Sequence, residues 1–125
     1  MFEKKIVLIT GGTGSLGQAL TARLLTLNVD TIRIYSRNEN KQIEMETKFS
    51  DSRIRFFLGD IRDLDRLTRA MDGVDFVFHA AALKHVPKIE YNPFEAIKTN
   101  VIGSQNVIDA CIASNVKKAI CVGTD

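Results

Sequence analysis

The sequence predicts an α/β protein with a doubly wound parallel sheet whose two faces are covered by helices. Two observations lead to this fold class. Short β-branched runs alternate five times with longer segments of helical period, and the first run ends in a glycine-rich turn. Because successive parallel strands are joined by right-handed crossovers, the alternation implies three layers and the strand order 3-2-1-4-5.

The expected strands are continuous apolar runs, as in strands that are buried on both faces. They cover residues 6–9, 32–35, 54–58, 74–78 and 119–122. The first run has only four residues before the glycines, too few for a signal peptide or a membrane span. No other stretch approaches the length that would cross a bilayer, so we expect no membrane segment.

Apolar residues between these runs recur at intervals of three and four, which places them on one face of a helix. We expect each such face to be buried against the sheet. The three faces comprise Leu16, Leu20, Arg23, Leu24 and Leu27; Leu64, Leu67 and Met71; and, in the longest helix, Phe94, Ile97, Val101, Ser104, Ile108, Cys111 and Ile112.

Polar residues mark where several helices begin. Ser36 has the capping-box spacing ahead of a helix from about Glu39 to Phe49. Asp63 is expected to cap the helix that follows it. Pro93 suits the first turn of the longest helix, where its missing N–H group costs nothing.

Composition narrows the classes of function. The chain has 125 residues, enough for one domain, and a net charge of +2 that is spread among acids. Such a small charge argues against nucleic acid or an anionic membrane as a partner. Cys111 and Cys121 are too few for a disulfide framework or a zinc site. We therefore expect a cytoplasmic protein without a metal site.

The turn from Thr10 to Gly17 follows the first strand and opens the first helix. Its spacing fits both G-x-G-x-x-G and G-x-x-G-x-x-G. Glycines permit the tight turn and the close approach of a pyrophosphate, which the first N–H groups of the helix would bind. The alternative is an ordinary turn without a ligand. The candidate cofactor-binding residues here are Gly11, Thr13, Gly14, Ser15, Leu16 and Gly17.

The end of the second strand favours NADP over NAD as the cofactor. An NAD site usually has an acidic residue there to bind the ribose 2′-OH, whereas this chain has Ser36 and Arg37. The guanidinium of Arg37 can bind a 2′-phosphate, and Ser36 and Lys41 can add a hydroxyl and a charge. The alternative is that Ser36 only caps the helix while Arg37 and Lys41 are solvated.

Residues after the third and fourth strands complete the candidate cofactor site. Asp60 can accept a hydrogen bond from the adenine amino group while Ile61 packs on the ring, although Asp60 could also be a simple turn residue. His79 is interpreted as a strand-end histidine rather than a catalyst. Small side chains then allow close approach of the ribose and nicotinamide, namely Ala80, Ala81 and Ala82.

These motifs together resemble the Rossmann-like extended short-chain dehydrogenases/reductases, in residues 10–17, 36–37, 59–63, 79–87 and 98–100. The run 80–87, with 90–93 and the terminal Thr124-Asp125, resembles more particularly the inverting UDP-N-acetylglucosamine 4,6-dehydratases of polysaccharide biosynthesis. The resemblance covers only the N-terminal part of such an enzyme. We therefore expect residues 1–125 to be the NADP-binding domain of a longer protein, truncated after the fifth strand and inactive alone.

The resemblance implies that bound NADP takes hydride from C4 of a UDP-sugar and returns it to C6 after water is lost across C5 and C6. It places Thr124 at the C4 oxygen. It makes Asp125 the acid for the leaving 6-hydroxyl, for which its pKa must be raised. Lys84 and His85 would contact the sugar nucleotide or help to shape the mouth of the pocket, and the alternative is a plain loop role. Asn100, grouped with the cofactor site, would bond a backbone carbonyl or be a polar residue of a helix face.

Two other functions remain open. A sugar-nucleotide 4-epimerase of the same family would be favoured if lysine does not follow Thr124-Asp125. A non-catalytic NADP-binding sensor module would be favoured if no Tyr-x-x-x-Lys occurs further on. Asn38 and Gly123 depart from the residues frequent in the family, which are aspartate and serine. The resemblance also implies a homo-oligomer, with the longest helix as a possible contact.

Overall fold

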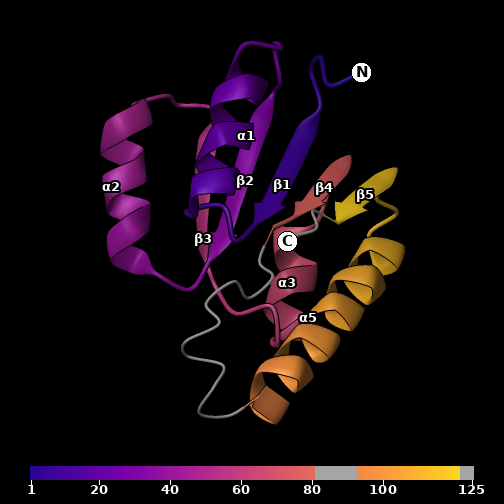
Figure 1. Ribbon diagram of the computed structural model, residues 1–125. Coiled ribbons are helices and arrows are strands. Elements are labelled where there is room, and N and C mark those ends of the chain that lie inside the picture. Colours follow the sequence, from indigo (N-terminus) through magenta and orange to yellow (C-terminus); the bar gives the residue numbers. More distant parts are fainter. Residues whose placement is uncertain (81–92, 122–125) are drawn as a thin grey trace.

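The computed structural model describes residues 1–80 and 93–121, the side chains of 93–101 excepted. The strands form one parallel sheet in the order β3-β2-β1-β4-β5, which confirms the predicted fold class and strand order (Figure 1). Along the chain the elements are β1 (Ile6–Thr10), α1 (Ser15–Leu25), β2 (Thr31–Ser36), α2 (Glu39–Phe49), β3 (Ile54–Leu58), α3 (Leu64–Ala70), β4 (Phe76–His79), α5 (Pro93–Ala113) and β5 (Lys118–Cys121).

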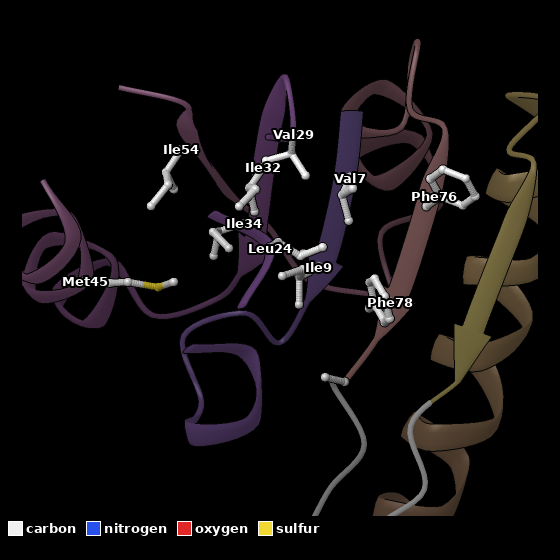
Figure 2. Packing of buried hydrophobic residues seen from close by; sticks show 11 residues of the cluster. Val7, Ile9, Leu24, Val29, Ile32, Ile34, Met45, Ile54, Phe76 and Phe78 are labelled. Atoms are coloured by element: carbon white, nitrogen blue, oxygen red, sulfur yellow. The ribbon is translucent and has the colours of Figure 1, made fainter. Parts of the chain in front are cut away.

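One face of the sheet is covered by α1 and α2. Leu24 of α1 and Met45 of α2 pack there against alternate residues of the strands, since successive side chains of a strand point to opposite faces (Figure 2). The buried strand residues on this face are Val7, Ile9, Ile32, Ile34, Ile54, Phe76 and Phe78.

The opposite face is covered by α3 and α5. Leu8, Tyr35 and Val77 come from the strand positions between those of the first cluster, and each is fully buried. The helix residues that pack with them are Leu67, Ala70, Val107, Ala110 and Cys111. The central strands are therefore buried on both sides, which explains why their sequences are continuous apolar runs.

The capping-box prediction at Ser36 is wrong. Ser36 is the last residue of β2, and α2 is capped instead by Asn38, whose side chain accepts from the Lys41 backbone N–H at 3.0 Å. The strand extends to Ser36 because its backbone pairs with β3 in register with Leu58. The cap prediction at Asp63 is confirmed, since its side chain accepts from the Arg66 N–H at 3.1 Å.

The predicted buried face of the longest helix is only partly correct. Cys111 is buried, but Ile108 and Ile112 are 47% and 72% exposed. The face toward the sheet carries Gly103 and Val107, a turn apart and both buried. Gly103 lets α5 approach Ile61 closely, whereas Ile108 and Ile112 lie outside the packed face.

Candidate functional site

The candidate site lies at the carboxyl edge of the sheet, where β1 and β4 are neighbours (Figure 1). From β1 the chain turns into α1 on one face, whereas α5, the next described element after β4, covers the opposite face. This is the switch point of the strand order. In open α/β sheets, ligands bind in the crevice beside such a point.

Three glycines of the turn after β1 are required by the protein itself. Gly11 has a φ of +63°, a backbone angle that residues with a side chain rarely adopt. A Cβ atom on Gly12 would lie 2.7 Å from Cγ2 of Ile34. A Cβ atom on Gly17 would lie 2.5 Å from backbone atoms of Gly12, so the turn and the start of α1 touch directly.

Gly14 is different from the other glycines of the turn. Its φ is −72°, an ordinary value, and the nearest atom to an added Cβ would be the Gly11 carbonyl oxygen at 3.5 Å. The residue is also exposed. Internal packing therefore does not demand glycine at this position, and the space beside it is open to a ligand.

The start of α1 is prepared for an anion. Gly14 is its N-cap and provides no side-chain hydrogen bond, and the first turn contains no acidic residue. In contrast, α2 and α3 are capped by Asn38 and Asp63 and have Glu39 and Asp65 in their first turns. Uncapped first-turn N–H groups at the positive end of a helix dipole attract negative charge. These groups fit a pyrophosphate.

A groove of about 530 Å³ runs between α1 and α2. It brings together three of the predicted cofactor residues of the turn, Thr13, Gly14 and Ser15, with Lys41 of α2. Lys48 also lines it and donates to the side chain of Gln18 at 2.9 Å, a pairing that sequence analysis did not find. The predicted residues Gly11, Leu16, Gly17 and Arg37 do not line this groove.

Gln42 holds the end of β2, although sequence analysis missed it. Its side-chain Nε2 donates to the Ser36 hydroxyl oxygen at 2.9 Å and to the Phe57 carbonyl at 3.1 Å. Ser36 and Gln42 are both buried. Its spacing of three residues from Met45, on one face of α2, is the signal that could have identified it, since a polar residue on the buried face of a helix needs hydrogen-bond partners.

Asp60 is held by two arginines. The guanidinium of Arg62 donates to both oxygens of the Asp60 carboxylate, with an Nη2–Oδ2 distance of 2.9 Å. Nη1 of Arg37 lies 3.7 Å from Oδ2 of Asp60. Hydrogen bonds from Arg62, with a smaller contribution from Arg37, keep the pKa of Asp60 below its ordinary value. The Arg37 side chain is 63% exposed, so its ion pair is weak and the guanidinium can turn to an incoming anion.

Tyr35 fixes the backbone beside Asp60. Its hydroxyl donates to the Asp60 carbonyl at 2.7 Å, and burial raises the pKa of Tyr35 to about 12. A Cβ atom on Gly59 would lie 2.5 Å from that hydroxyl oxygen. The segment after β3 is therefore placed by a residue of β2.

Ile61 lies between this segment and α5. Its carbonyl accepts from the Asn106 side chain at 2.9 Å, and its side chain reaches Gly103. Ile61 is half-buried, so part of it stays accessible for the predicted contact with adenine.

His79 and Thr10 join the ends of β4 and β1. They are paired in register, and the Thr10 hydroxyl lies 2.6 Å from His79 Nδ1. The Ala80 N–H donates to the hydroxyl and to the carbonyl of Thr10, each at 3.1 Å. Burial lowers the pKa of His79. His79 is the last residue of β4, as predicted, but its partner is 69 residues away and no local pattern indicates it.

Several predicted site residues lie outside the described residues: Ala81, Ala82, Lys84, His85, Thr124 and Asp125. For Asn100 the structure describes only the backbone, within α5. Within residues 1–80 and 93–121, no cluster of acidic, histidine or cysteine side chains could hold a metal ion. No helix in the same part of the chain has the length and apolar character to span a membrane.

Comparisons with known proteins agree with this architecture. The chain is 57% identical over its whole length to UDP-N-acetylglucosamine 4,6-dehydratase (inverting) from Campylobacter jejuni, of which it covers 38%. It is 48% identical to UDP-glucose 4-epimerase from Rickettsia prowazekii, again covering 38% of that protein. A solved dTDP-glucose 4,6-dehydratase from Streptomyces venezuelae, with NAD and TYD bound, matches 91% of this chain and 38% of its own, with a TM-score of 0.80 and 28% identity.

The chain thus spans under two fifths of the length of these relatives. The family model described as polysaccharide biosynthesis protein matches residues 7–125, which include every element of the sheet but the first residue of β1. The uncapped start of α1, the open side of Gly14 and this match agree, and the chain belongs to the polysaccharide biosynthesis protein family.

Proposed function

We propose that this chain binds NADP and forms the cofactor-binding part of a longer nucleotide-sugar 4,6-dehydratase of the UDP-N-acetylglucosamine type. The observation that carries the proposal is the open glycine turn at an uncapped helix start, where Gly14 leaves room that packing does not need. The Campylobacter jejuni relative supports the choice of reaction, because it shares 57% of the residues.

Each proposed cofactor residue has a separate task. Backbone N–H groups at Ser15 and Leu16 bind the pyrophosphate, since no side chain caps them. Arg37 and Lys41 bind the 2′-phosphate, and Asp60 accepts from the adenine amino group. Ile61, the alanines Ala80, Ala81 and Ala82, and Asn100 complete the walls of the site.

Bound NADP would supply the acceptor for hydride from C4 of the sugar and the donor for its return to C6. The residues proposed for this chemistry are Thr124, which binds the C4 oxygen, and Asp125, which protonates the leaving 6-hydroxyl. Lys84 and His85 are proposed to contact the UDP-sugar.

Titration calorimetry with NADP⁺ and NAD⁺ tests the cofactor. We expect tighter binding of NADP⁺, because the end of β2 carries Arg37 and no acidic residue. Arg37→Ala should weaken NADP⁺ binding by about tenfold to a hundredfold, the worth of a charged hydrogen bond, and leave NAD⁺ binding unchanged. Arg69→Ala is the matched control, since this exposed arginine lies in the last turn of α3, at the other edge of the sheet.

Tighter binding of NAD⁺ in the wild-type protein, or an equal loss of both cofactors in Arg37→Ala, would remove the NADP assignment. NAD would then be the cofactor, as in the solved dehydratase from Streptomyces venezuelae. Absence of binding by either cofactor would remove the whole proposal.

The second candidate function is a 4-epimerase, which the Rickettsia prowazekii relative favours. Incubation of the full-length protein with UDP-N-acetylglucosamine separates the two. A product that has lost one water by mass supports the dehydratase, whereas a product of unchanged mass and inverted C4 supports the epimerase. Unchanged substrate with bound cofactor would support a non-catalytic sensor module.

The partners we propose are a UDP-sugar and a second copy of the full-length protein, in the cytoplasm. Support for self-association comes from α5, where three isoleucines are exposed: Ile102, Ile108 and Ile112. Ile108 and Ile112 are about one helical turn apart, and neighbouring exposed apolar side chains are typical of interaction surfaces. Sedimentation of the full-length protein tests the oligomer.

A further inference from the structure

A chain of polar groups, buried at two of its three members, crosses the switch point, and the proposed function does not use it. Thr10 and His79 are 0% and 5% exposed, and their side chains meet at 2.6 Å. The other ring nitrogen of His79, Nε2, lies 3.5 Å from the Ser104 hydroxyl. The three residues come from β1, β4 and α5, so the chain joins both strands of the crevice to the helix behind it.

The partners determine where the imidazole proton lies. Thr10 Oγ1 accepts from the Ala80 N–H at 3.1 Å. The Thr10 hydroxyl hydrogen then needs an acceptor, and among the described residues its 2.6 Å contact with His79 Nδ1 supplies one. Nδ1 must then carry no proton, and the proton of the neutral ring is on Nε2, facing Ser104.

We propose that His79, neutral and protonated on Nε2, is a positioning residue that sets the geometry of the crevice between β1 and β4. Thr10 leads directly into the glycine turn, and Ala80 begins the segment that leaves β4. The bond between Thr10 and His79 therefore holds together the ends of β1 and β4, beside the turn that is proposed to bind the cofactor. This inference rests on the proposed function.

A second proton on the ring would break the arrangement. It would lie on Nδ1 and face Thr10 Oγ1, whose own hydrogen would lose its acceptor. Burial lowers the pKa of His79 and so favours the neutral ring. The groups around the ring from the described elements are the hydroxyls of Thr10 and Ser104, and its register partner in β5 is Cys121. None of these is a carboxylate that would stabilise an imidazolium.

The first test needs no cofactor. Ring nitrogen NMR of the ¹⁵N-histidine-labelled protein at neutral pH should show Nδ1 of His79 unprotonated and Nε2 protonated. A proton on Nδ1, or rapid averaging of the two nitrogens, would overturn the inference. This result stands even if the protein binds neither NADP⁺ nor NAD⁺, in which case only the proposed function fails.

The second test measures NADP⁺ affinity in matched variants. Thr10→Val and His79→Leu should each weaken NADP⁺ binding about tenfold, because each leaves the other member of the buried pair without its hydrogen-bond partner. Thr10→Ser keeps the hydroxyl and should bind like the wild-type protein. His79→Asn keeps an acceptor in place of Nδ1 and should also bind well.

The pH profile separates positioning from general packing. Affinity of the wild-type protein should fall as the pH drops below the ordinary histidine range, whereas His79→Asn should lack that fall. If Thr10→Val and His79→Leu do not fold, the NADP⁺ affinity of Thr10→Ser and the pH profile of His79→Asn still test the proposal. Equal affinities and equal pH profiles in all variants would contradict the proposal.

Discussion

At the scale of single residues, the turn after β1 shows that one motif can contain glycines for different reasons. Gly17 is required because α1 begins in contact with the Gly12 backbone, whereas Gly14 touches nothing closely. A glycine that the fold does not need is informative about a ligand. The distinction comes from the position of an added Cβ atom, and the motif alone does not contain it.

Alanine at the two positions should therefore affect different properties, stability at position 17 and cofactor binding at position 14. Gly17→Ala should destabilise the protein by about 1–3 kcal/mol, the usual cost of overpacking. Gly14→Ala should cost less than about 1 kcal/mol, since alanine is only a poorer N-cap than glycine, but should weaken NADP⁺ binding strongly. Urea unfolding and calorimetric titration measure the two effects. Normal cofactor affinity in Gly14→Ala would argue against a diphosphate at this turn.

At the scale of elements, the docking of α5 depends on its smallest residue. A Cβ atom on Gly103 would lie 2.3 Å from Cδ1 of Ile61, so the helix approaches the segment after β3 only because position 103 has no side chain. Asn106, nearly one turn later, donates to the Ile61 carbonyl at 2.9 Å. The position of Ile61, and with it the predicted adenine contact, is coupled to α5.

Gly103→Ala should destabilise the protein by about 1–3 kcal/mol, because Ile61 must leave its rotamer. Intrinsic helix propensity alone would have the opposite effect, because it favours alanine over glycine by about 1 kcal/mol. The loss of stability caused by Gly103→Ala should be smaller when it is measured in an Ile61→Ala background than in the wild-type protein. Gln105→Ala, an exposed position of α5, is the control. If thermal unfolding shows that Gly103→Ala is more stable than the wild-type protein, the contact between position 103 and Ile61 is loose.

At the scale of the whole molecule, a single carboxylate ties together three strands at the edge of the sheet opposite the site. Asp75, just before β4, accepts from the Ile6 N–H of β1 at 2.9 Å and pairs with Lys117, next to β5, at 3.4 Å. The Ile6 N–H, and then Lys117, keep the pKa of Asp75 below its ordinary value.

A carboxylate whose pKa is lower in the folded state stabilises the protein above its unfolded pKa of about 3.9, and this contribution disappears as the pH falls below that value. Asp75→Ala should cost about 1–3 kcal/mol at neutral pH, because the half-buried Ile6 N–H loses its acceptor. Asp75→Asn keeps an acceptor and should cost less. Both variants should lose less stability than the wild-type protein on acidification below about pH 4. An unchanged acid dependence, from urea unfolding across pH, would contradict this role.

Much of the architecture could be predicted because it depends on local pattern. The bounds of α2 and β3 agree with prediction, since periodicity and turn residues act within a few positions. The bounds of β4 are shifted toward His79 because strand pairing with β1 decides them. The capping-box prediction at Ser36 is wrong for the same reason, because pairing of its backbone with β3 outweighs a local spacing rule.

The sequence by itself determined the alternation of strands and helices, the strand order and the glycine turn, because apolar period, crossover handedness and backbone freedom are properties of short segments. Only the tertiary structure decided which side chains meet at the carboxyl edge of the sheet. Thr10 reaches His79, and Arg37 reaches Asp60, across separations of tens of residues. Such pairs depend on how the crossovers bring the strand ends together, and no local spacing encodes them.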